Sequence, residues 1–151
     1  MATRNGSATW TGDLKTGSGE LTVGERAWTS AYSGSSRLHG VLPGYEDGAG
    51  TNPEELLAAA HAACFNMALS YALTEAGLAP PRLVQTRARV HLRNVGGAPT
   101  IQQIDIETQG DVPGLDQDGF RERAEEAKSG CIISRALGGV EQINLSATLL
   151  S

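Results

Sequence analysis

A chain of 151 residues with 40% hydrophobic residues can form one domain with a core, because domains cluster near ~100–150 residues. The formal net charge of −5, with no basic stripe, argues against nucleic acid as a partner. We expect no membrane contact, because no stretch approaches the ~18 consecutive apolar residues of a span. The N-terminus lacks an apolar signal core, so the expected location is the cytoplasm.

The first third of the chain predicts strands followed by a loop. Residues 7–33 contain short runs of β-forming residues separated by glycine turns, which indicates an N-terminal antiparallel meander. Residues 34–50 are rich in glycine, serine, proline and acidic residues and predict a long loop. Arg37 and His39 are its reactive side chains, although an isolated arginine in such a loop is usually a surface residue.

A long helix is predicted over residues 53–76. Asn52 can cap it, Pro53 suits the first helical position, and Glu55 has the spacing of a capping box. Its residues are apolar on nearly every face until Gly77. Such a helix is expected to be buried in a core or between subunits.

The second half predicts a hairpin, two helices and a final strand. The corresponding ranges are 85–110, 117–129, 131–137 and 141–150. Together with the meander, they indicate one α+β domain over residues 1–151 with mostly antiparallel sheet.

The two cysteines, Cys64 and Cys131, are 67 positions apart. In a reducing cytoplasm they are expected to be free or redox-active rather than a structural disulfide. No metal site is expected, because the cysteines and the histidines lack the paired spacing of zinc ligands; the histidines are His39, His61 and His91.

Each cysteine allows a structural and a chemical interpretation. Cys64 lies inside the apolar helix, where a free cysteine often acts as a small hydrophobic residue. Cys131 follows Gly130 at a helix break, and a helix N-terminus there would lower the pKa of its thiol. His61, three residues before Cys64, permits a cysteine–histidine pair, but a hydrogen-bonded core histidine is the more frequent role.

The segments "GTNPEELLAAAHAACFNMAL" and "AKSGC" resemble the OsmC/Ohr family of bacterial peroxidases, and the form "AAHAACF" is closer to its OsmC branch. The resemblance implies an OsmC-like fold: antiparallel sheets wrapped around a long buried central helix in an intertwined homodimer. It also implies a thiol peroxidase for organic hydroperoxides, and less efficiently hydrogen peroxide, in oxidative and osmotic stress. The resemblance implies no cofactor. It does imply an external dithiol reductant of the lipoyl or thioredoxin-like kind.

The same resemblance assigns roles to four residues. Cys64 matches the peroxidatic position and Cys131 the resolving position, which implies a Cys64–Cys131 disulfide during turnover. Glu54 matches the carboxylate of the "NPE" motif, and Arg37 is the best match for the family's arginine, with Arg26 as the alternative. Ile132 departs from the family, which often has proline directly after the second cysteine.

The chemistry explains why these residue types are needed together. A buried Cys64 thiolate requires a positive charge, which Arg37 can supply while Glu54 holds the guanidinium by bidentate hydrogen bonds. Ten helical residues span ~15 Å, so Glu54 reaches Cys64 only if the helix bends or a second subunit supplies Glu54 and Arg37.

Two other interpretations of the sequence stay open. The first is a non-enzymatic apolar-ligand-binding dimer in which both cysteines are structural. The second is a dimer stabilised by a permanent disulfide.

Overall fold

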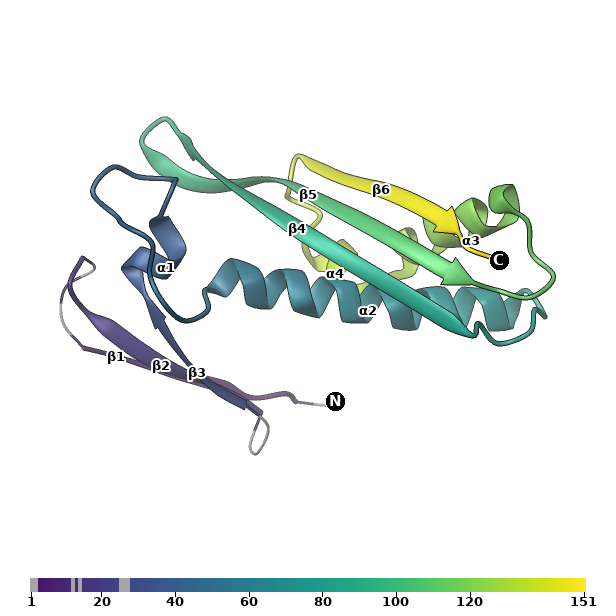
Figure 1. The fold of residues 1–151 in the computed structure, drawn as a ribbon, viewed down its shortest axis with the longest axis horizontal. Coiled ribbons are helices and arrows are strands. Elements are labelled where there is room, and N and C mark those ends of the chain that lie inside the picture. The colour runs from purple at the N-terminus through teal and green to yellow at the C-terminus, as the bar shows by residue number, and fades with distance from the viewer. Residues whose placement is uncertain (1–2, 12, 14, 25–27) are drawn as a thin grey trace. The chain divides into compact units, whose positions relative to one another are not determined.

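The computed structural model describes residues 3–11, 13, 15–24 and 28–151 and has an α+β fold with two three-stranded sheets (Figure 1). Contacts between Cα atoms group the chain into two compact units. The first comprises residues 1–56 and 93–99, and the second comprises residues 57–92 and 100–151. The expectation of a single domain over residues 1–151 stays a prediction.

The first unit contains the expected meander. It consists of β1 (Gly6–Thr11), β2 (Ser18–Val23) and β3 (Trp28–Ser33), paired antiparallel in that order. On the middle strand, Gly19 pairs with Trp10 on one side and with Tyr32 on the other. A Cβ atom at Gly19 would lie 2.6 Å from the Tyr32 ring. Glycine therefore leaves room for the two aromatic rings, whose centroids are 5.4 Å apart.

The prediction of a loop over residues 34–50 is wrong for its first residues, which form a short helix, α1 (Gly34–Leu38). Ser33 caps α1 through a capping box: its hydroxyl accepts from the Ser36 N–H, and the Ser36 hydroxyl accepts from the Ser33 N–H, both at 3.0 Å. The sequence pattern S-x-x-S carries this signal weakly because serine replaces the usual Glu or Gln. The chain then returns at Gly50, where glycine is required because φ is +97° and an added Cβ atom would lie 2.4 Å from the Ala31 carbonyl oxygen.

Helix α2 (Pro53–Glu75) begins where the sequence predicts. The Asn52 side chain accepts from the Glu55 N–H at 2.9 Å. The Glu55 carboxylate accepts from the Thr51 hydroxyl, also at 2.9 Å. The side-chain amide of Asn52 donates to the Ser36 carbonyl at 2.9 Å, which ties the start of α2 to α1.

The second unit is built on a sheet with the order β4–β5–β6, formed by β4 (Leu83–Val95), β5 (Ala98–Asp111) and β6 (Gln142–Leu149). Gly96 and Gly97 both have positive φ, as a two-residue hairpin turn between β4 and β5 requires. β5 and β6 are parallel, so this pair is an exception to the expected mostly antiparallel sheet, which β1–β2 and β2–β3 follow. The physical reason is the connection: α3 (Gln117–Gly130) and α4 (Ile132–Ala136) make a helical crossover between β5 and β6.

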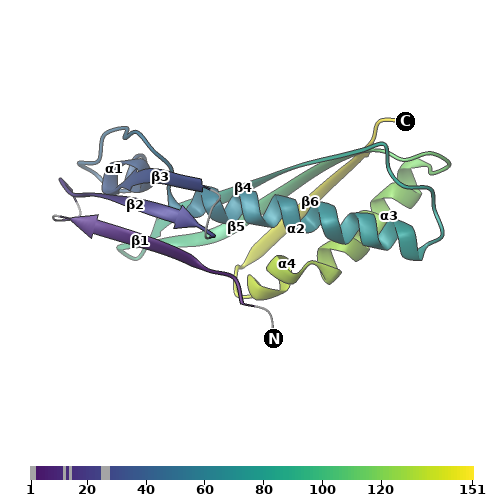
Figure 2. The same cartoon turned by 90° about the horizontal axis from the view of Figure 1, so that it is seen from below.

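The core of the second unit joins α2, α3 and the sheet (Figure 2). Its fully buried side chains come from α2, from β5 and from α3; they include Phe65, Leu69, Leu73, Ile104, Ile106 and Phe120. Gly110 lets α3 approach the sheet, because a Cβ atom there would lie 2.5 Å from the Phe120 ring. This contact packs α3 against the sheet, and the C-terminal end of α3 at Gly130 leads directly to Cys131.

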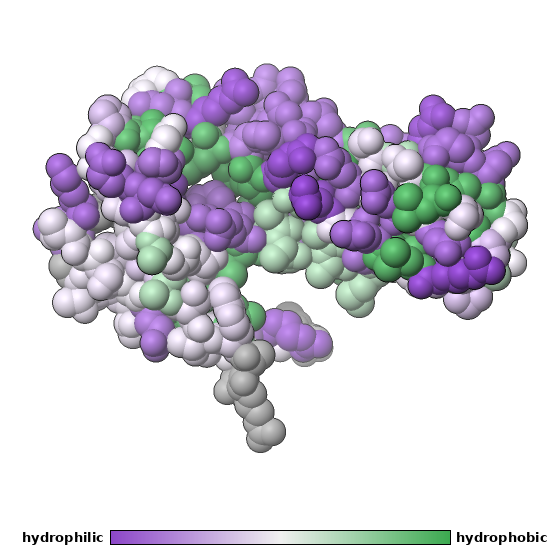
Figure 3. Space-filling view, in the orientation of Figure 1, coloured by the Kyte–Doolittle hydropathy of each residue, from purple (hydrophilic) through white to green (hydrophobic). Residues whose placement is uncertain are grey.

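The expectation that no stretch is apolar enough for a membrane span is wrong for α2. This helix is long and apolar enough to cross a membrane, judged by length and composition alone. Core helices pass the same test, and three side chains of α2 lie in the core. Most of its apolar stretch is nevertheless not buried by the rest of the chain. Figure 3 shows the corresponding pale green, mildly hydrophobic surface over the course of α2.

Candidate active site

Arg37 and Glu54 form an ion pair within the first unit. Arg37 lies in the last turn of α1, and Glu54 lies in the first turn of α2. Nη2 of Arg37 is 2.8 Å and Nε is 3.0 Å from Oε1 of Glu54, and Nε is also 3.2 Å from Oε2. The Glu54 side chain is 11% exposed and that of Arg37 is 46% exposed. The carboxylate therefore holds the guanidinium while part of it faces solvent.

A small cavity of about 220 Å³ lies beside Arg37 in the same unit. It is lined by aromatic and small residues together with the arginine, namely Trp10, Tyr32, Ser33, Gly34, Arg37 and Pro53. The Tyr32 hydroxyl donates to the Thr9 carbonyl at 3.1 Å, which holds this ring in place. The apolar side chains that line this cavity therefore lie next to the positively charged guanidinium of Arg37.

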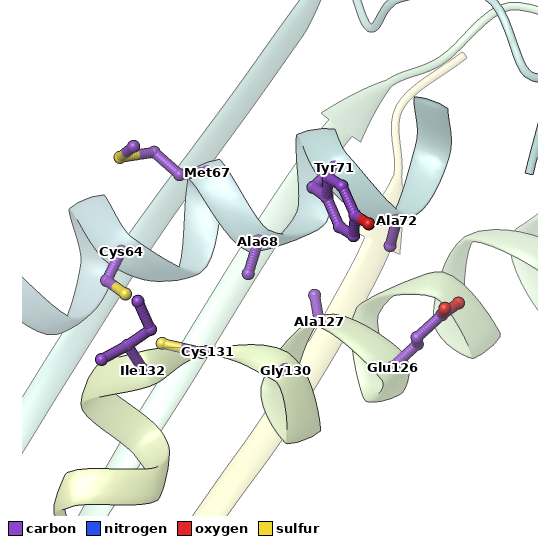
Figure 4. Close-up of a pocket in the computed structure, with 10 residues that line it drawn as sticks. All are labelled: Cys64, Met67, Ala68, Tyr71, Ala72, Glu126, Ala127, Gly130, Cys131 and Ile132. Atoms are coloured by element: carbon purple, nitrogen blue, oxygen red, sulfur yellow. The ribbon is translucent and has the colours of Figure 1, made fainter. Parts of the chain in front are cut away.

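The two cysteines meet within the second unit. Cys64 is half-buried on α2, and Cys131 is 1% exposed at the N-cap of α4. Both are free thiols that line one cavity, and Figure 4 shows their sulfur atoms pointing toward one another. Residues separated by 67 positions are therefore placed for thiol chemistry with each other.

The cavity that the cysteines share has a volume of about 350 Å³ and is mainly apolar. Its walls come from α2 and from the α3–α4 junction: Cys64, Met67, Ala68, Tyr71, Ala72, Glu126, Ala127, Gly130, Cys131 and Ile132. Three of these side chains, Met67, Tyr71 and Ile132, are 66–75% exposed. The cavity thus opens beside an uncovered apolar surface and suits a small apolar molecule.

The surroundings of Cys131 favour its thiolate. Burial raises the pKa of this thiol, but hydrogen bonds from the Ser134 backbone and side chain, from Cys64 and from the Ile133 backbone together lower it below its usual value. The Ser134 N–H lies 3.5 Å from Sγ of Cys131. Ile132, which departs from the family pattern, does not prevent α4 from starting at this point.

His61 is fully buried and hydrogen-bonded, as the structural interpretation of the sequence expects. Its Nε2 lies 2.7 Å from the Ser134 hydroxyl oxygen, and its Nδ1 has no hydrogen-bond partner among the residues that the structure describes. Burial lowers the pKa of His61, so the ring is neutral at physiological pH. Sequence reasoning missed Ser134, whose only signal is its position three residues after Cys131, where an N-cap side chain accepts the backbone N–H.

The structure brings the predicted residues together in two pairs. Arg37 and Glu54 lie in the first unit, and Cys64 and Cys131 lie in the second. Arg26, the alternative arginine, is outside the described residues. Among residues 3–11, 13, 15–24 and 28–151, no group of three or more His, Cys, Asp or Glu side chains is placed to bind a metal ion.

Known proteins resemble this chain in sequence. The family model for OsmC-like proteins matches residues 46–146. Peroxiredoxin OsmC of Escherichia coli strain K12 is 40% identical over 136 residues, which are 89% of this chain and 89% of that protein.

Solved structures show the same fold. An OsmC-like protein from Mycoplasma pneumoniae has a TM-score of 0.73 at 14% identity, with 99% of both chains covered. An organic hydroperoxide resistance protein from Elizabethkingia anophelis has a TM-score of 0.68 at 22% identity, covering 99% of this chain and 96% of that one. On its family match and its 40% identical relative, the chain belongs to the OsmC-like protein family.

Proposed function

We propose that this protein is a cysteine-based peroxidase that reduces organic hydroperoxides to alcohols, and hydrogen peroxide less efficiently. The observation that carries the proposal is the meeting of Cys64 and Cys131 on one apolar cavity in an OsmC-like chain. The 40% identical relative is a peroxiredoxin, and relatives in fold are organic hydroperoxide resistance proteins. An apolar cavity accommodates the organic part of such a substrate.

The reaction begins with attack of the Cys64 thiolate on the distal oxygen of the hydroperoxide. The O–O bond breaks, the alcohol leaves after taking a proton, and Cys64 becomes sulfenic acid. Cys131 then displaces hydroxide from that sulfur to form the Cys64–Cys131 disulfide and water. Two thiols from an external dithiol reductant, of the lipoyl or thioredoxin-like kind, restore both cysteines by exchange.

Arg37 stabilises the Cys64 thiolate and the peroxide oxygens in this proposal, and Glu54 orients Arg37. Glu54 and Cys64 are ten residues apart on one continuous helix, and ten helical residues span about 15 Å. The pair that serves a given Cys64 therefore comes from a second copy of the chain, in a homodimer. The exposed apolar side chains beside the cysteines support this assembly, because a second copy would cover them.

The cellular location follows from the same chemistry. A cytoplasmic location keeps the resting thiols reduced and provides dithiol reductants. The resemblance to OsmC proteins, rather than the chemistry, is what suggests defence against oxidative and osmotic stress as the function in the cell.

A stoichiometric reaction tests the peroxidase proposal. Reduced protein is mixed with one equivalent of cumene or t-butyl hydroperoxide per chain, free thiols are counted, and cross-linked peptides are identified by mass. We expect the loss of two thiols per chain and a Cys64–Cys131 peptide. Two thiols that survive in the presence of unreacted hydroperoxide would overturn the proposal.

The alternative function is an apolar-ligand-binding dimer with structural cysteines, which the cavity of about 350 Å³ favours. This alternative predicts that a Cys64→Ser/Cys131→Ser variant still binds an apolar fluorescent probe and that peroxide forms no disulfide in the unmodified protein. The peroxidase predicts a disulfide within one turnover. The same mass measurement therefore separates the two functions.

Complementation tests the shared site. Chains carrying Arg37→Ala and chains carrying Cys64→Ser are co-expressed with different tags, and doubly tagged dimers are isolated. If sites are built from two chains, each mixed dimer has one complete site and recovers about half of the wild-type activity per dimer, whereas each variant alone has almost none. Mixed dimers as inactive as the Arg37→Ala homodimer would overturn the shared site.

A further inference from the structure

A buried hydrogen bond between His61 and Ser134 connects α2 to α4 directly behind the resolving cysteine. The His61 Nε2 atom and the Ser134 hydroxyl oxygen are 2.7 Å apart, although the residues are 73 positions apart in sequence. His61 is 0% exposed and Ser134 is 8% exposed. The peroxidase cycle described above gives neither residue a role.

The direction of this hydrogen bond follows from the other ring nitrogen. Nδ1 of His61 is buried, and no side chain or backbone group in the described part of the chain is its hydrogen-bond partner. If Nε2 carried no proton, Nδ1 would be a buried N–H group without an acceptor, and such groups are rare in folded proteins. The tautomer with the proton on Nε2 leaves only a lone pair unpaired at Nδ1. His61 is therefore the donor, and the Ser134 hydroxyl oxygen is the acceptor.

A serine hydroxyl that accepts from His61 has its own proton free to donate. The Ser134 backbone N–H donates to the Cys131 sulfur at 3.5 Å. Side chains three residues apart on a helix are neighbours, so the free hydroxyl proton of Ser134 lies within reach of the same sulfur. The Ser134 backbone and side chain both lower the pKa of the Cys131 thiol.

We propose that the Ser134 hydroxyl is a catalytic hydrogen-bond donor to the Cys131 thiolate, and that His61 is a positioning residue that holds this hydroxyl in the donating orientation. The inference rests on the proposed peroxidase function and concerns its second step. The thiol proton of Cys131 goes to solvent, and the thiolate attacks the Cys64 sulfenic sulfur. The S–S bond forms, the S–O bond breaks, and the departing hydroxide takes a proton to become water. Cys131 supplies the two electrons that reduce the sulfenic acid.

A neutral histidine suits this positioning role. Since burial lowers the pKa of His61, the ring keeps its single donor through the physiological range. The titratable or charged side chains near Cys131 in its unit include Cys64 and His61 from α2, Glu126 and Lys128 from α3, and Arg135 from α4. The proposed role also accounts for the partner of His61. Its Nε2–H is hydrogen-bonded to Ser134 and not to Cys64, which lies three residues later on the same helix.

The test follows both steps separately after rapid mixing of reduced protein with t-butyl hydroperoxide. Cys64 sulfenic acid is quantified by dimedone trapping, and the disulfide is quantified by mass. The informative variants are Ser134→Ala, His61→Leu and His61→Gln, whose amide can replace the Nε2–H donor. Thr108→Ala is the matched control, because it removes another buried hydroxyl of this unit, bonded to Thr86 at 2.8 Å.

We expect sulfenic acid formation to stay within about twofold of wild type in every variant. Disulfide formation falls about tenfold in Ser134→Ala and His61→Leu, as for a thiol pKa one unit higher, and its pH profile moves to higher pH. His61→Gln and Thr108→Ala retain most of the disulfide rate. This pattern separates a donor to Cys131 from a general loss of structure.

Three results would overturn the inference. Ser134→Ala with a wild-type rate and pH profile of disulfide formation would show that the hydroxyl is not a donor. His61→Gln as slow as His61→Leu, or Thr108→Ala as slow as Ser134→Ala, would assign the pair to structure alone. A wild-type protein that forms no sulfenic acid would overturn the peroxidase proposal itself, which is a distinct outcome.

Discussion

Arg37 and Glu54 are joined by two guanidinium nitrogens, with Nη2 2.8 Å and Nε 3.0 Å from the same carboxylate oxygen. This ion pair couples the single turn of α1 to the first turn of α2 and fixes the direction of the guanidinium. A lysine at position 37 could not reproduce it, because an ammonium group lacks the planar fork of donors.

The ion pair leads to a prediction for Glu54→Gln. A neutral amide holds the guanidinium less firmly, since hydrogen bonds to charged groups contribute about 1.5–3 kcal/mol. We expect the rate constant for peroxide-dependent loss of the Cys64 thiol to fall about tenfold, measured with t-butyl hydroperoxide. Glu55→Gln is the control, because Glu55 accepts from the Thr51 hydroxyl instead of Arg37. Equal effects of the two variants would contradict the role of Glu54.

The two cysteines are expected to fail differently when each is replaced. Cys64→Ser should consume no hydroperoxide, because the attacking sulfur is gone. Cys131→Ser should consume one equivalent rapidly, and excess peroxide should then consume a second equivalent slowly as it oxidises the Cys64 sulfenic acid to the irreversible sulfinic acid. Peroxide consumption and intact mass distinguish these outcomes. Sustained turnover by Cys131→Ser with a dithiol reductant would show that resolution does not need this cysteine.

Filling the cavity should discriminate between substrates. Ala68 lines the cavity of about 350 Å³ next to the cysteines, and Ala68→Leu would occupy part of it. We expect kcat/KM for cumene hydroperoxide to fall about tenfold, as steric exclusion in an apolar pocket is worth about 1–3 kcal/mol. Hydrogen peroxide, which has no organic part, serves as the control substrate. An equal fall for both peroxides would place the organic group elsewhere.

The close approach of Gly110 to Phe120 predicts a stability effect. A Cβ atom at Gly110 would lie 2.5 Å from the buried Phe120 ring, so α3 or β5 must shift in Gly110→Ala. Overpacking of this kind lowers the free energy of unfolding by about 1–3 kcal/mol. Gly139→Ala is the control, because nothing lies within 4 Å of its added carbon. Urea unfolding of both variants measures the difference, and equal midpoints would contradict the packing argument.

Asp105 on β5 should contribute to stability only above acidic pH. Hydrogen bonds from the amides of Asn144 and Gln103, and then from His91, lower the pKa of Asp105 from 3.8 to about 2. Because the folded value lies below the unfolded one, the contribution is complete above about pH 4 and is lost as the pH falls through about 2.

We expect this contribution to be about 1 kcal/mol, because solvent screens a partly exposed carboxylate. Urea unfolding of wild type and Asp105→Asn at pH 5 and pH 2.5 measures it, and the two proteins should differ more at the higher pH. Asp118→Asn, at a carboxylate 88% exposed on α3, is the control. A constant difference between wild type and Asp105→Asn would contradict the linkage.

The local elements were predictable where the signal is local. Pro53, Asn52 and an unbroken apolar run predict α2, whose start is stabilised by the Asn52 cap that the sequence indicates. Alternation of apolar and polar residues predicts the strands. The helix α1 was missed because its capping box uses Ser36 rather than Glu or Gln, and glycine and serine around it are typical of loops.

The direction of β6 was not predictable from alternation, which is the same for parallel and antiparallel strands. The crossover through α3 and α4 decides it, because the chain leaves β5 at one end and must return to the other end before β6 begins. The location of α2 was likewise not predictable from its composition. An alanine-rich apolar helix can lie in a core, at an interface or in a membrane, and composition alone does not distinguish them.

The sequence by itself determined the candidate residues: two cysteines that can do redox chemistry, an arginine, and a glutamate at a helix start. Local spacing cannot bring residues 64 and 131 together, or bring His61 against Ser134. Those juxtapositions depend on the burial of Phe120 against Gly110 and of α2 against α3, which are long-range packing interactions. The tertiary structure therefore decided that the two cysteines share one cavity, because only the packing of α2 against the α3–α4 junction brings Cys64 to Cys131.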